Sequence, residues 1–500
     1  MIFSAVFTGR KRRPVPKAPK PRRWTRKKRF IALFMILLHV LGALTSVQAV
    51  METRTSQGAI AWAISLNTFP YAALPAYWIF GRTKFNGYVK KRRDSLDETN
   101  LSVRRVIEQA REKQLAAADT GGSARLVEQL AKLPATSGNE ALLLRNGEQI
   151  FPSIFKGIEN AREYVLVQFY IVRDDNLGQE LQKRLLAAAE RNVRVRFLYD
   201  EIGCYRLPRR YLDTLRNAGV QVEAFKSTKG PGNRFQLNFR NHRKIVVVDG
   251  RYAWVGGANV VDEYIGRHPR LTPWVDAMVR IRGPAVQFIQ VPFLEDWYWA
   301  TGTLLDLDWT LQPAPNGSSQ TVLSLPSGPA DQFETCTLYY LNAIHAAQSR
   351  FWVASPYFVP DEQIVSALKL AALRGVDVRV VVPDKCDQFL VNLSGWSFIE
   401  PLVSAGVKLY RFTGGVLHHK VMLADGYRSA IGSANFDNRS FRLNFEMTVE
   451  VQDEAFAREV ERLFIDDFAA SRLTTEKELE ARSFPFRLAV QVARLLAPVQ

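Results

Sequence analysis

HRKIVVVDGRYAWVGGAN, residues 242–259, and HHKVMLADGYRSAIGSAN, residues 418–435, are two copies of one pattern in a chain of 500 residues. Each copy reads H-x-K-x4-D-x6-G-x2-N, in which x is any residue. From average residue frequencies, one chance match in a chain of this length has a probability on the order of 10⁻⁴. Two matches therefore indicate an internal duplication.

The residues before each copy follow the same order of predicted elements. Apolar runs bounded by turn residues predict strands, and periodic apolar residues predict the helices between them. In the first half these are strands at 164–171, 193–199 and 220–225 and helices at 176–191 and 209–218; in the second half they are strands at 351–358, 376–382 and 407–412 and helices at 361–374 and 397–405. Alternating strands and helices are typical of an α/β domain. We therefore predict a bilobed α/β fold whose halves share a cleft.

The histidine and lysine of each copy are candidate catalytic residues. They stand two positions apart beside the apolar runs 245–248 and 421–423, so both side chains are expected on the same face of a strand. Cleaving a negatively charged phosphodiester without a metal requires cations and hydrogen-bond donors around its oxygens. One neutral histidine can attack phosphorus, while the other, protonated, donates to the leaving oxygen and then deprotonates the incoming hydroxyl. The residues that supply these groups are His242, Lys244, Asn259, His418, Lys420 and Asn435.

The remaining histidines and the cysteines receive structural interpretations. A single histidine beside a valine-rich strand is usually a hydrogen-bonded core residue, and only the duplication favours catalysis for the two motif histidines. The histidines interpreted as structural are His39, His268, His345 and His419. No other histidine or cysteine stands at ligand spacing from the motifs, so we expect no metal and no cofactor. The three cysteines are scattered and odd in number, which predicts reduced thiols facing a cytosol.

The basic charge is concentrated at the N-terminus. The formal net charge is +18, but twelve lysines and arginines and no acidic residue fall within residues 1–29, so residues 30–500 carry only +6. A modest net charge over the rest of the chain argues against a groove that binds the phosphate backbone of a nucleic acid. We therefore expect no nucleic acid partner.

Two apolar segments follow this basic N-terminus. Residues 30–50 contain one potentially charged side chain, His39, and are long enough to cross a bilayer. Residues 59–80 are uncharged but contain Pro70 and Pro75, which weaken a second span without excluding it. The outer flanks are basic, so a hairpin of two transmembrane helices over 30–80 would place both ends in the cytoplasm. The alternative is a cleaved signal peptide, because residues 47–49 have the small-residue pattern of a cleavage site.

The catalytic part is expected to begin near Ala141. Residues 81–140 are polar and charged, with a helix-prone stretch at 101–115, and predict a linker that holds the catalytic part near the lipid surface. The two halves are then expected at 141–310 and 311–483. The last segment, 484–500, alternates apolar residues with two arginines, which predicts either an amphipathic helix on the membrane surface or an ordinary packed terminal helix.

At the two motifs the chain resembles the phospholipase D superfamily, whose hallmark is a doubled H-x-K-x4-D pattern. A closer resemblance, over most of residues 141–500, is to the bacterial cardiolipin synthases within it. The strings that carry this resemblance are FYIVRDD (169–175), RNHRK (240–244), GGAN (256–259), DEY (262–264), PWVD (273–276), LEDW (294–297), PSGP (326–329), PYFVPD (356–361), NFDNRS (435–440) and LNFE (443–446). The paired N-terminal spans are also similar to those of that family.

The resemblance implies a duplicated phospholipase D-like α/β/α fold and a reaction between two phosphatidylglycerol molecules that forms cardiolipin and glycerol through a phosphohistidine. It implies that His242 is the nucleophile and His418 the general acid and base. It also implies that Asp276 and Glu446, each about thirty residues past its histidine, orient the two rings. The motif aspartates, Asp249 and Asp425, belong to the catalytic motif but are open to an architectural role. One departure is Gly257, where the second copy has Ser433.

The resemblance further implies a multi-pass protein of the bacterial inner membrane whose catalytic part faces the cytoplasm. Its expected partners are phosphatidylglycerol and the other lipids of the membrane. Three alternatives remain open: a phospholipase D or a phosphatidyltransferase with another acceptor, a nuclease of the superfamily, and a non-catalytic membrane scaffold. The first uses the same motif residues, whereas the last is disfavoured because both half-sites are intact.

Overall fold

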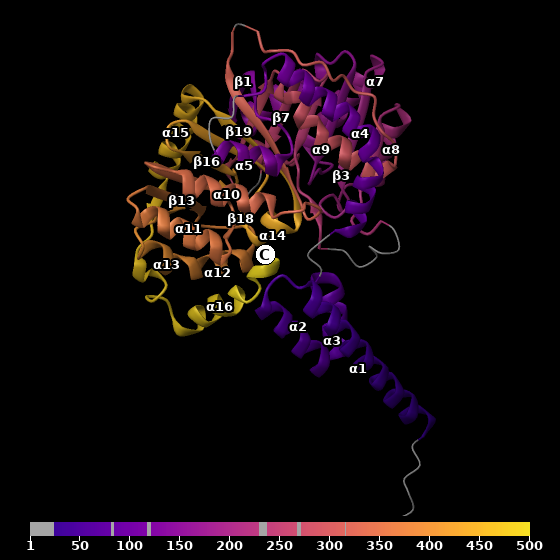
Figure 1. The fold of residues 1–500 in the computed structure, drawn as a ribbon, viewed down its shortest axis with the longest axis vertical. Coiled ribbons are helices and arrows are strands. Elements are labelled where there is room, and N and C mark those ends of the chain that lie inside the picture. Colours follow the sequence, from indigo (N-terminus) through magenta and orange to yellow (C-terminus); the bar gives the residue numbers. More distant parts are fainter. Residues whose placement is uncertain (1–24, 82–84, 118–121, 230–237, 268–271, 316) are drawn as a thin grey trace, which may run out of the picture. The chain divides into compact units, whose positions relative to one another are not determined.

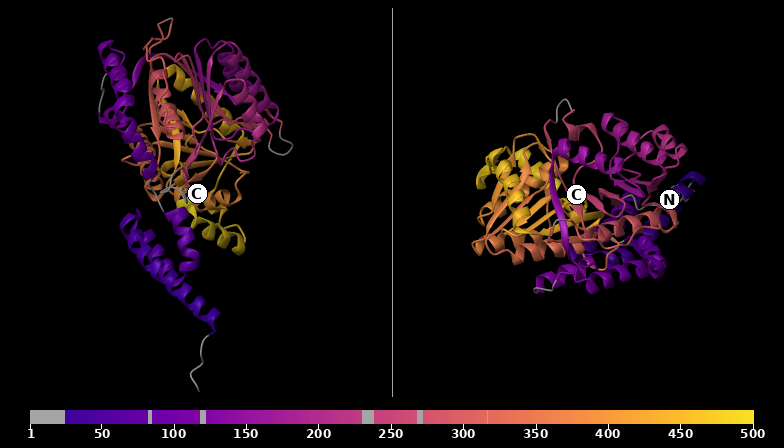
Figure 2. Two further views of the ribbon diagram at one scale, coloured as in Figure 1. Left: turned by 90° about the vertical axis from the view of Figure 1, so that its right-hand side faces the viewer. Right: turned by 90° about the horizontal axis from the view of Figure 1, so that it is seen from above.

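The computed structural model describes residues 25–81, 85–117, 122–229, 238–267, 272–315 and 317–500. The chain forms two compact units, residues 1–81 and residues 82–500. Most of the basic N-terminus, residues 1–24, lies outside the described residues, as does His268. Figures 1 and 2 show the described elements.

The first unit is helical and contains one long apolar helix. Helix α1, Arg26–Glu52, has 27 residues and contains an 18-residue stretch with a mean hydropathy of 2.4, which is enough to cross a bilayer. It is followed by α2 (Ser56–Thr68), α3 (Pro70–Ala76) and a π-helical turn (Tyr77–Gly81). Helices α1 and α2 meet at Gly42, where a β-carbon would lie 2.2 Å from the Leu66 carbonyl oxygen. Glycine is needed at this close contact.

The second predicted span is interrupted. Phe69 leaves the helical conformation before Pro70, because a residue that precedes proline is disfavoured there. Among the described residues, α1 is the one helix that has both the length and the composition of a membrane span. A hairpin of two full spans therefore remains a prediction.

The second unit is built on one sheet of sixteen described strands. Two strands meet antiparallel at its centre, β1 (Thr136–Arg145) and β10 (Gln320–Ser327). Outward from β1 come β9 (Ala277–Arg282), β7 (Tyr252–Gly256), β6 (Ile245–Val248), β2 (Tyr164–Phe169), β3 (Arg194–Asp200) and β4 (Gln221–Phe225). Outward from β10 come β19 (Asn444–Gln452), β17 (Arg428–Gly432), β16 (Val421–Ala424), β11 (Arg350–Ala354), β13 (Asp377–Pro383), β14 (Lys408–Phe412) and β20 (Ser471–Leu473). The first six strands on each side match in order and direction, which confirms the predicted duplication.

Helices cover the sheet in both halves, giving the α/β architecture expected from the sequence (Figures 1 and 2). In the first half they are α6 (Asn146–Glu159), α7 (Asn176–Glu190), α8 (Arg209–Asn217) and α9 (Ala285–Thr301). In the second half they are α10 (Thr335–Ala346), α11 (Glu362–Leu373), α12 (Phe389–Gly395), α13 (Ile399–Val403), α14 (Asn438–Arg442), α15 (Glu454–Ala469) and α16 (Phe484–Arg494). One hydrophobic core contains residues of both α9 and α15, and therefore joins the two halves.

The strand predicted at 351–358 is divided in the structure. Strand β11 ends at Ala354, and after Pro356 the chain forms β12 (Phe358–Val359), which pairs with β18 (Phe436–Asp437). Proline cannot donate a ladder hydrogen bond, so the chain leaves the sheet there. The division brings Tyr357 to the cleft described below.

The segment predicted as a linker is part of the second unit. Helix α4, Asn86–Glu112, packs on α9, and helix α5, Gly122–Ala131, packs on α10. Phe85 and Tyr88 are buried among aromatic rings that include Trp299 and Phe445. The structure thus differs from the sequence interpretation because a few apolar residues, spaced to share a helix face, are enough to bury an otherwise polar helix.

Tyr88 tests this packing. Its hydroxyl donates a 2.8 Å hydrogen bond to Asp296 Oδ1 on α9, and Asp296 is fully buried. Removing a donor from a buried carboxylate costs about 1–3 kcal/mol. We therefore expect Tyr88→Phe to lower the free energy of unfolding by this amount, measured by denaturation in detergent. Tyr205→Phe is the matched control because Tyr205 is exposed, and equal stability of the two variants would contradict the assignment of α4 to the core.

Candidate active site

A cleft of about 650 Å³ contains residues from both motif copies. His242 and Asn259 come from the first half, and His418 and Asn435 from the second. The two histidines therefore line one cavity, as the duplication predicts. Lys244 and Lys420 are buried beside their histidines and are absent from the described lining of the cleft.

Each motif histidine is held by the backbone of the opposite half. Strand β5 (Arg240–Asn241) pairs with the start of β19, and the His242 N–H donates to the Phe445 carbonyl at 2.9 Å. Strand β15 (Val416–Leu417) pairs with β8 (Trp274–Val275), and the His418 N–H donates to the Val275 carbonyl at 2.7 Å. In both cases, a short strand of one half pairs with a strand of the other half beside the site.

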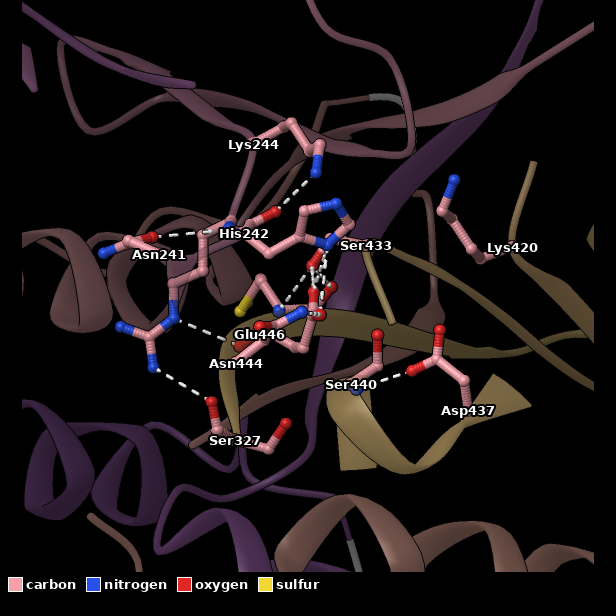
Figure 3. A network of polar contacts seen from close by, with 12 residues as sticks. Asn241, His242, Lys244, Ser327, Lys420, Ser433, Asp437, Ser440, Asn444 and Glu446 are labelled. Carbon is pink, nitrogen blue, oxygen red and sulfur yellow. Dashed lines mark hydrogen bonds and ion pairs between the residues drawn. The ribbon is translucent and has the colours of Figure 1, made fainter. Parts of the chain in front are cut away.

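As a result of this pairing, each motif histidine contacts a carboxylate of the opposite half. His242 Nδ1 lies 2.9 Å from Glu446 Oε2, and His418 Nδ1 lies 2.7 Å from Asp276 Oδ2 (Figure 3 shows the first pair). Both carboxylates contact a motif histidine, as expected, but each contacts the histidine of the other half and not the one about thirty residues before it. The carboxylates follow Phe445 and Val275 directly, so the backbone bonds that hold each histidine also bring it to the carboxylate of the other half. Because Nδ1 of each ring binds a carboxylate, Nε2 is the nitrogen that can face a substrate, and in His418 it lies 3.4 Å from Lys420 Nζ.

Burial makes both rings neutral at pH 7. The pKa of His242 is lowered to about 4, because burial and the charges of Lys244 and Lys420 outweigh the attraction of Glu446. The pKa of His418 is also lowered to about 4, by burial and by Lys420, against the opposing effect of Asp276 and Asp387. The balance of charges around the two rings differs: Lys244 and Lys420 oppose Glu446 at His242, whereas Lys420 opposes Asp276 and Asp387 at His418.

The motif lysines bind the backbone of their own histidines. Lys244 Nζ donates to the His242 carbonyl at 2.6 Å, and Lys420 Nζ donates to the His418 carbonyl. Burial lowers the pKa of Lys244 well below its usual value and that of Lys420 to about 8. These residues lie in the extended segments just before β6 and β16 and not within the strands. Their predicted role as phosphate ligands remains a prediction.

The residue between histidine and lysine points away from the cleft in both copies. The Arg243 guanidinium forms a 2.8 Å ion pair with Asp296 of α9, and His419 Nε2 lies 3.0 Å from Asp467 of α15. Histidine and lysine therefore share one side of an extended segment, while the residue between them faces a helix behind it. His419 keeps the structural interpretation.

The motif aspartates are architectural. Asp249 accepts hydrogen bonds from the backbone N–H groups of Arg162, Glu163 and Tyr164 at 2.8–2.9 Å, which orders the start of β2. Asp425 accepts equivalent bonds from residues 348–350, before β11. Both aspartates have positive φ, 53° and 55°, which few residues other than glycine, asparagine and aspartate adopt readily. Neither is among the residues that line the described cleft.

The two asparagines differ in their partners. Asn259 Oδ1 accepts from the Ile171 N–H at 3.1 Å, and its amide donates to the Tyr264 hydroxyl, also at 3.1 Å. The Asn435 Oδ1 atom is buried without a protein hydrogen bond in the described residues. Both side chains line the cleft, but only Asn435 has an unsatisfied polar atom there.

The first motif copy has Gly257 where the second has Ser433, and this difference has a steric cause. Ser433 Oγ donates to Glu446 Oε2 at 2.5 Å. At Gly257 a β-carbon would lie 2.3 Å from Asp276 Oδ1, so the shorter aspartate occupies the space in which a serine would stand. The longer Glu446 is therefore accompanied by Ser433, whereas the shorter Asp276 lies against Gly257, which has no side chain.

Several aromatic residues of the site were given no role from the sequence. The Tyr170 ring lies 4.9 Å from the His242 ring, and the Trp274 and Tyr264 rings lie 5.3 and 5.6 Å from the His418 ring. Tyr357 donates to Asp387 at 2.9 Å at the same cleft. All four belong to strings that carry the family resemblance, but their spacing in the sequence contains no signal for these contacts.

Comparison with known proteins identifies relatives along nearly the whole chain. The family described as "Cardiolipin synthase, PLD-like domain" matches residues 154–293 and 340–468. A protein named cardiolipin synthase A from Pseudomonas fluorescens is 47% identical over 94% of this chain and 98% of its own length. One of the same name from Pseudomonas aeruginosa is 45% identical over 94% and 96%. A crystal structure of phosphatidylserine synthase from Haemophilus influenzae has a TM-score of 0.57 at 16% identity, covering 76% of this chain and all of the other, which shows a shared fold.

A double-mutant cycle tests the crossed pairs. His242→Ala and Glu446→Gln remove one contact between them, so we expect a coupling energy of about 1–3 kcal/mol in unfolding free energy. His418→Ala with Glu446→Gln is the matched control, with a coupling below about 0.5 kcal/mol. A larger coupling in the control than in the first cycle would support pairing within each half and contradict the structure.

Proposed function

This chain belongs to the cardiolipin synthase family of phospholipase D-like proteins, and on that premise we propose that it transfers a phosphatidyl group between two phosphatidylglycerol molecules, forming cardiolipin and releasing glycerol. The observation that supports this most directly is the cleft with two neutral imidazoles. Each comes from a different half, and each binds a buried carboxylate through Nδ1. Such a pair can act on one phosphodiester from two sides.

In the first step, Nε2 of His242 attacks phosphorus and a P–N bond forms as the P–O bond to glycerol breaks. His418 gives its Nε2 proton to the departing glycerol oxygen. In the second step, His418 takes the proton of the acceptor hydroxyl, whose oxygen attacks phosphorus and breaks the P–N bond. Glu446 and Asp276 stabilise the positive charge that each ring carries during its step.

The surroundings of the rings support this division of roles. At His242 two ammonium groups, those of Lys244 and Lys420, oppose one carboxylate, Glu446, and favour the neutral form that can attack. At His418 two carboxylates, Asp276 and Asp387, oppose one ammonium group, Lys420, and favour the protonated form that can donate. A bound phosphodiester adds a negative charge beside both rings, and an adjacent anion raises the pKa of a histidine. We propose that this raises the pKa of His418 enough for it to hold its proton.

The apolar helix of the first unit supports a membrane placement. We propose that α1 anchors the protein in the bacterial inner membrane and that 59–80 returns the chain, so that the basic residues 1–29 and the catalytic unit both face the cytoplasm. Residues 141–310 and 311–483 would then form the two catalytic halves. Within the catalytic unit, the matching central strands begin at Thr136 and Gln320.

One assay tests the function. Purified protein in vesicles with labelled phosphatidylglycerol as the sole phospholipid should form cardiolipin and glycerol in equal amounts. Because both histidines are needed, we expect His242→Ala and His418→Ala each to lower the rate by about 10³-fold or more. Tyr205→Phe, at an exposed position, serves as control. Phosphatidic acid without cardiolipin would instead identify a hydrolase and contradict the proposal.

A second experiment separates the roles of the histidines. A phosphatidyl ester of p-nitrophenol, labelled in its acyl chains, has a leaving group that needs no proton. His418→Asn should therefore still form the covalent intermediate but discharge it slowly, so labelled protein accumulates, whereas His242→Asn should remain unlabelled. Accumulation in His242→Asn and its absence in His418→Asn would reverse the assignment.

A further inference from the structure

Two neighbouring helices of the second half present an apolar surface to solvent. Helices α12 and α16 pack against each other. Their large apolar side chains on the outer side are between 44% and 78% exposed. We call this surface the apolar rim; it consists of Phe389, Leu390, Phe484, Leu488, Val492, Leu495 and Leu496.

The sequence of α16 explains why it has two different faces. Val490 and Ala493 are buried against Leu393 and Trp396 of the adjacent segment. Phe484, Leu488, Val492 and Leu495 follow one another at intervals of three or four residues and form a stripe that points away from that core. Helix α16 is therefore a packed helix that also exposes an apolar face.

Along α16 the charge is of one sign, whereas the exposed Asp387 precedes α12. Arg482, Arg487 and Arg494 are exposed, and residues 481–500 contain no acidic residue. Arg482 lies over the Trp396 ring at 4.8 Å and over the Phe486 ring at 5.7 Å. An exposed apolar stripe accompanied by arginines is typical of a helix that lies in the interface of a membrane with anionic lipids.

The apolar rim is continuous with the catalytic cleft. Leu390 and Leu496 belong to the rim and also line the cleft that contains His242 and His418. A lipid whose phosphate reaches these histidines has acyl chains that must leave the bilayer or remain at its surface. An apolar border between cleft and bilayer spares those chains contact with water.

We propose that the apolar rim is a docking surface for a bilayer that contains anionic phospholipid, and that lipids enter the cleft past Leu390 and Leu496. The inference rests on the proposed function for the identity of the lipid but not for the docking itself. The arginines and the continuity with the cleft favour a lipid surface over a second copy of this chain, because a self-associated rim would cover the entry to the cleft.

A fluorescence experiment tests the docking. The full chain with Cys386→Ser is labelled with an environment-sensitive dye at Leu495→Cys, and the remaining Cys204 and Cys336 are buried. Ile465→Cys on α15 is the control because Ile465 is 52% exposed and α15 and α16 lie at opposite ends of the second half (Figure 1). In phosphatidylglycerol vesicles with brominated acyl chains, we expect fluorescence to fall at least two-fold at position 495 and to stay unchanged at 465. No quenching at 495, or a disulfide between two copies formed by the unlabelled Leu495→Cys variant, would overturn the proposal.

A kinetic experiment tests lipid entry. The variant Leu488→Gln/Val492→Gln/Leu495→Gln changes the rim without touching the cleft lining, and Leu370→Gln/Leu373→Gln/Ile465→Gln is the control at other exposed positions. We expect the rim variant to raise KM at least five-fold for phosphatidylglycerol in vesicles and to leave KM unchanged for a short-chain phosphatidylglycerol dissolved as monomers. An equal change for both substrates, or none, would overturn the proposal. If the wild-type protein formed no cardiolipin from phosphatidylglycerol, that result would count against the proposed function. The quenching result would still be valid evidence for the docking.

Discussion

The site depends on two buried histidine–carboxylate contacts that cross between the halves. His242 binds Glu446 and His418 binds Asp276, at 2.9 and 2.7 Å. Both carboxylates are almost completely buried, so each would be a costly unpaired charge without the ring of the other half. Because the same strands that deliver the carboxylates also hold the histidine backbones, neither half can form a complete site alone.

Burial determines the chemistry of this arrangement. It keeps both imidazoles neutral and lowers the pKa of both motif lysines. Other groups also bind the carboxylates: Ser433 and Asn444 donate to Glu446, and the Ala277 N–H donates to Asp276. A connected network of this kind orients the rings more strictly than either hydrogen bond could alone.

Within each motif, the position of a residue determines which contacts it makes. Histidine and lysine share the side toward the cleft, while the residue between them anchors the segment to a helix behind the sheet. The aspartate closes the turn and binds the backbone at the start of a neighbouring strand. The apolar rim extends this organisation outward, because α12 and α16 place apolar side chains at the border between cleft and solvent.

The sequence by itself determined the duplication, the order of strands and helices in each half, and the two motif histidines, because periodicity and spacing are local properties of the chain. It also determined that α1 can cross a membrane. Tertiary structure alone decided which carboxylate meets which histidine, that Tyr88 and its helix belong to the core, and that Tyr170, Tyr264 and Trp274 surround the rings. These contacts join residues that are far apart in the chain, and the pairing of β5 with β19 and of β8 with β15 creates the site contacts among them. A repeat in sequence shows that two halves exist, but only their packing shows that each histidine contacts the carboxylate of the other half.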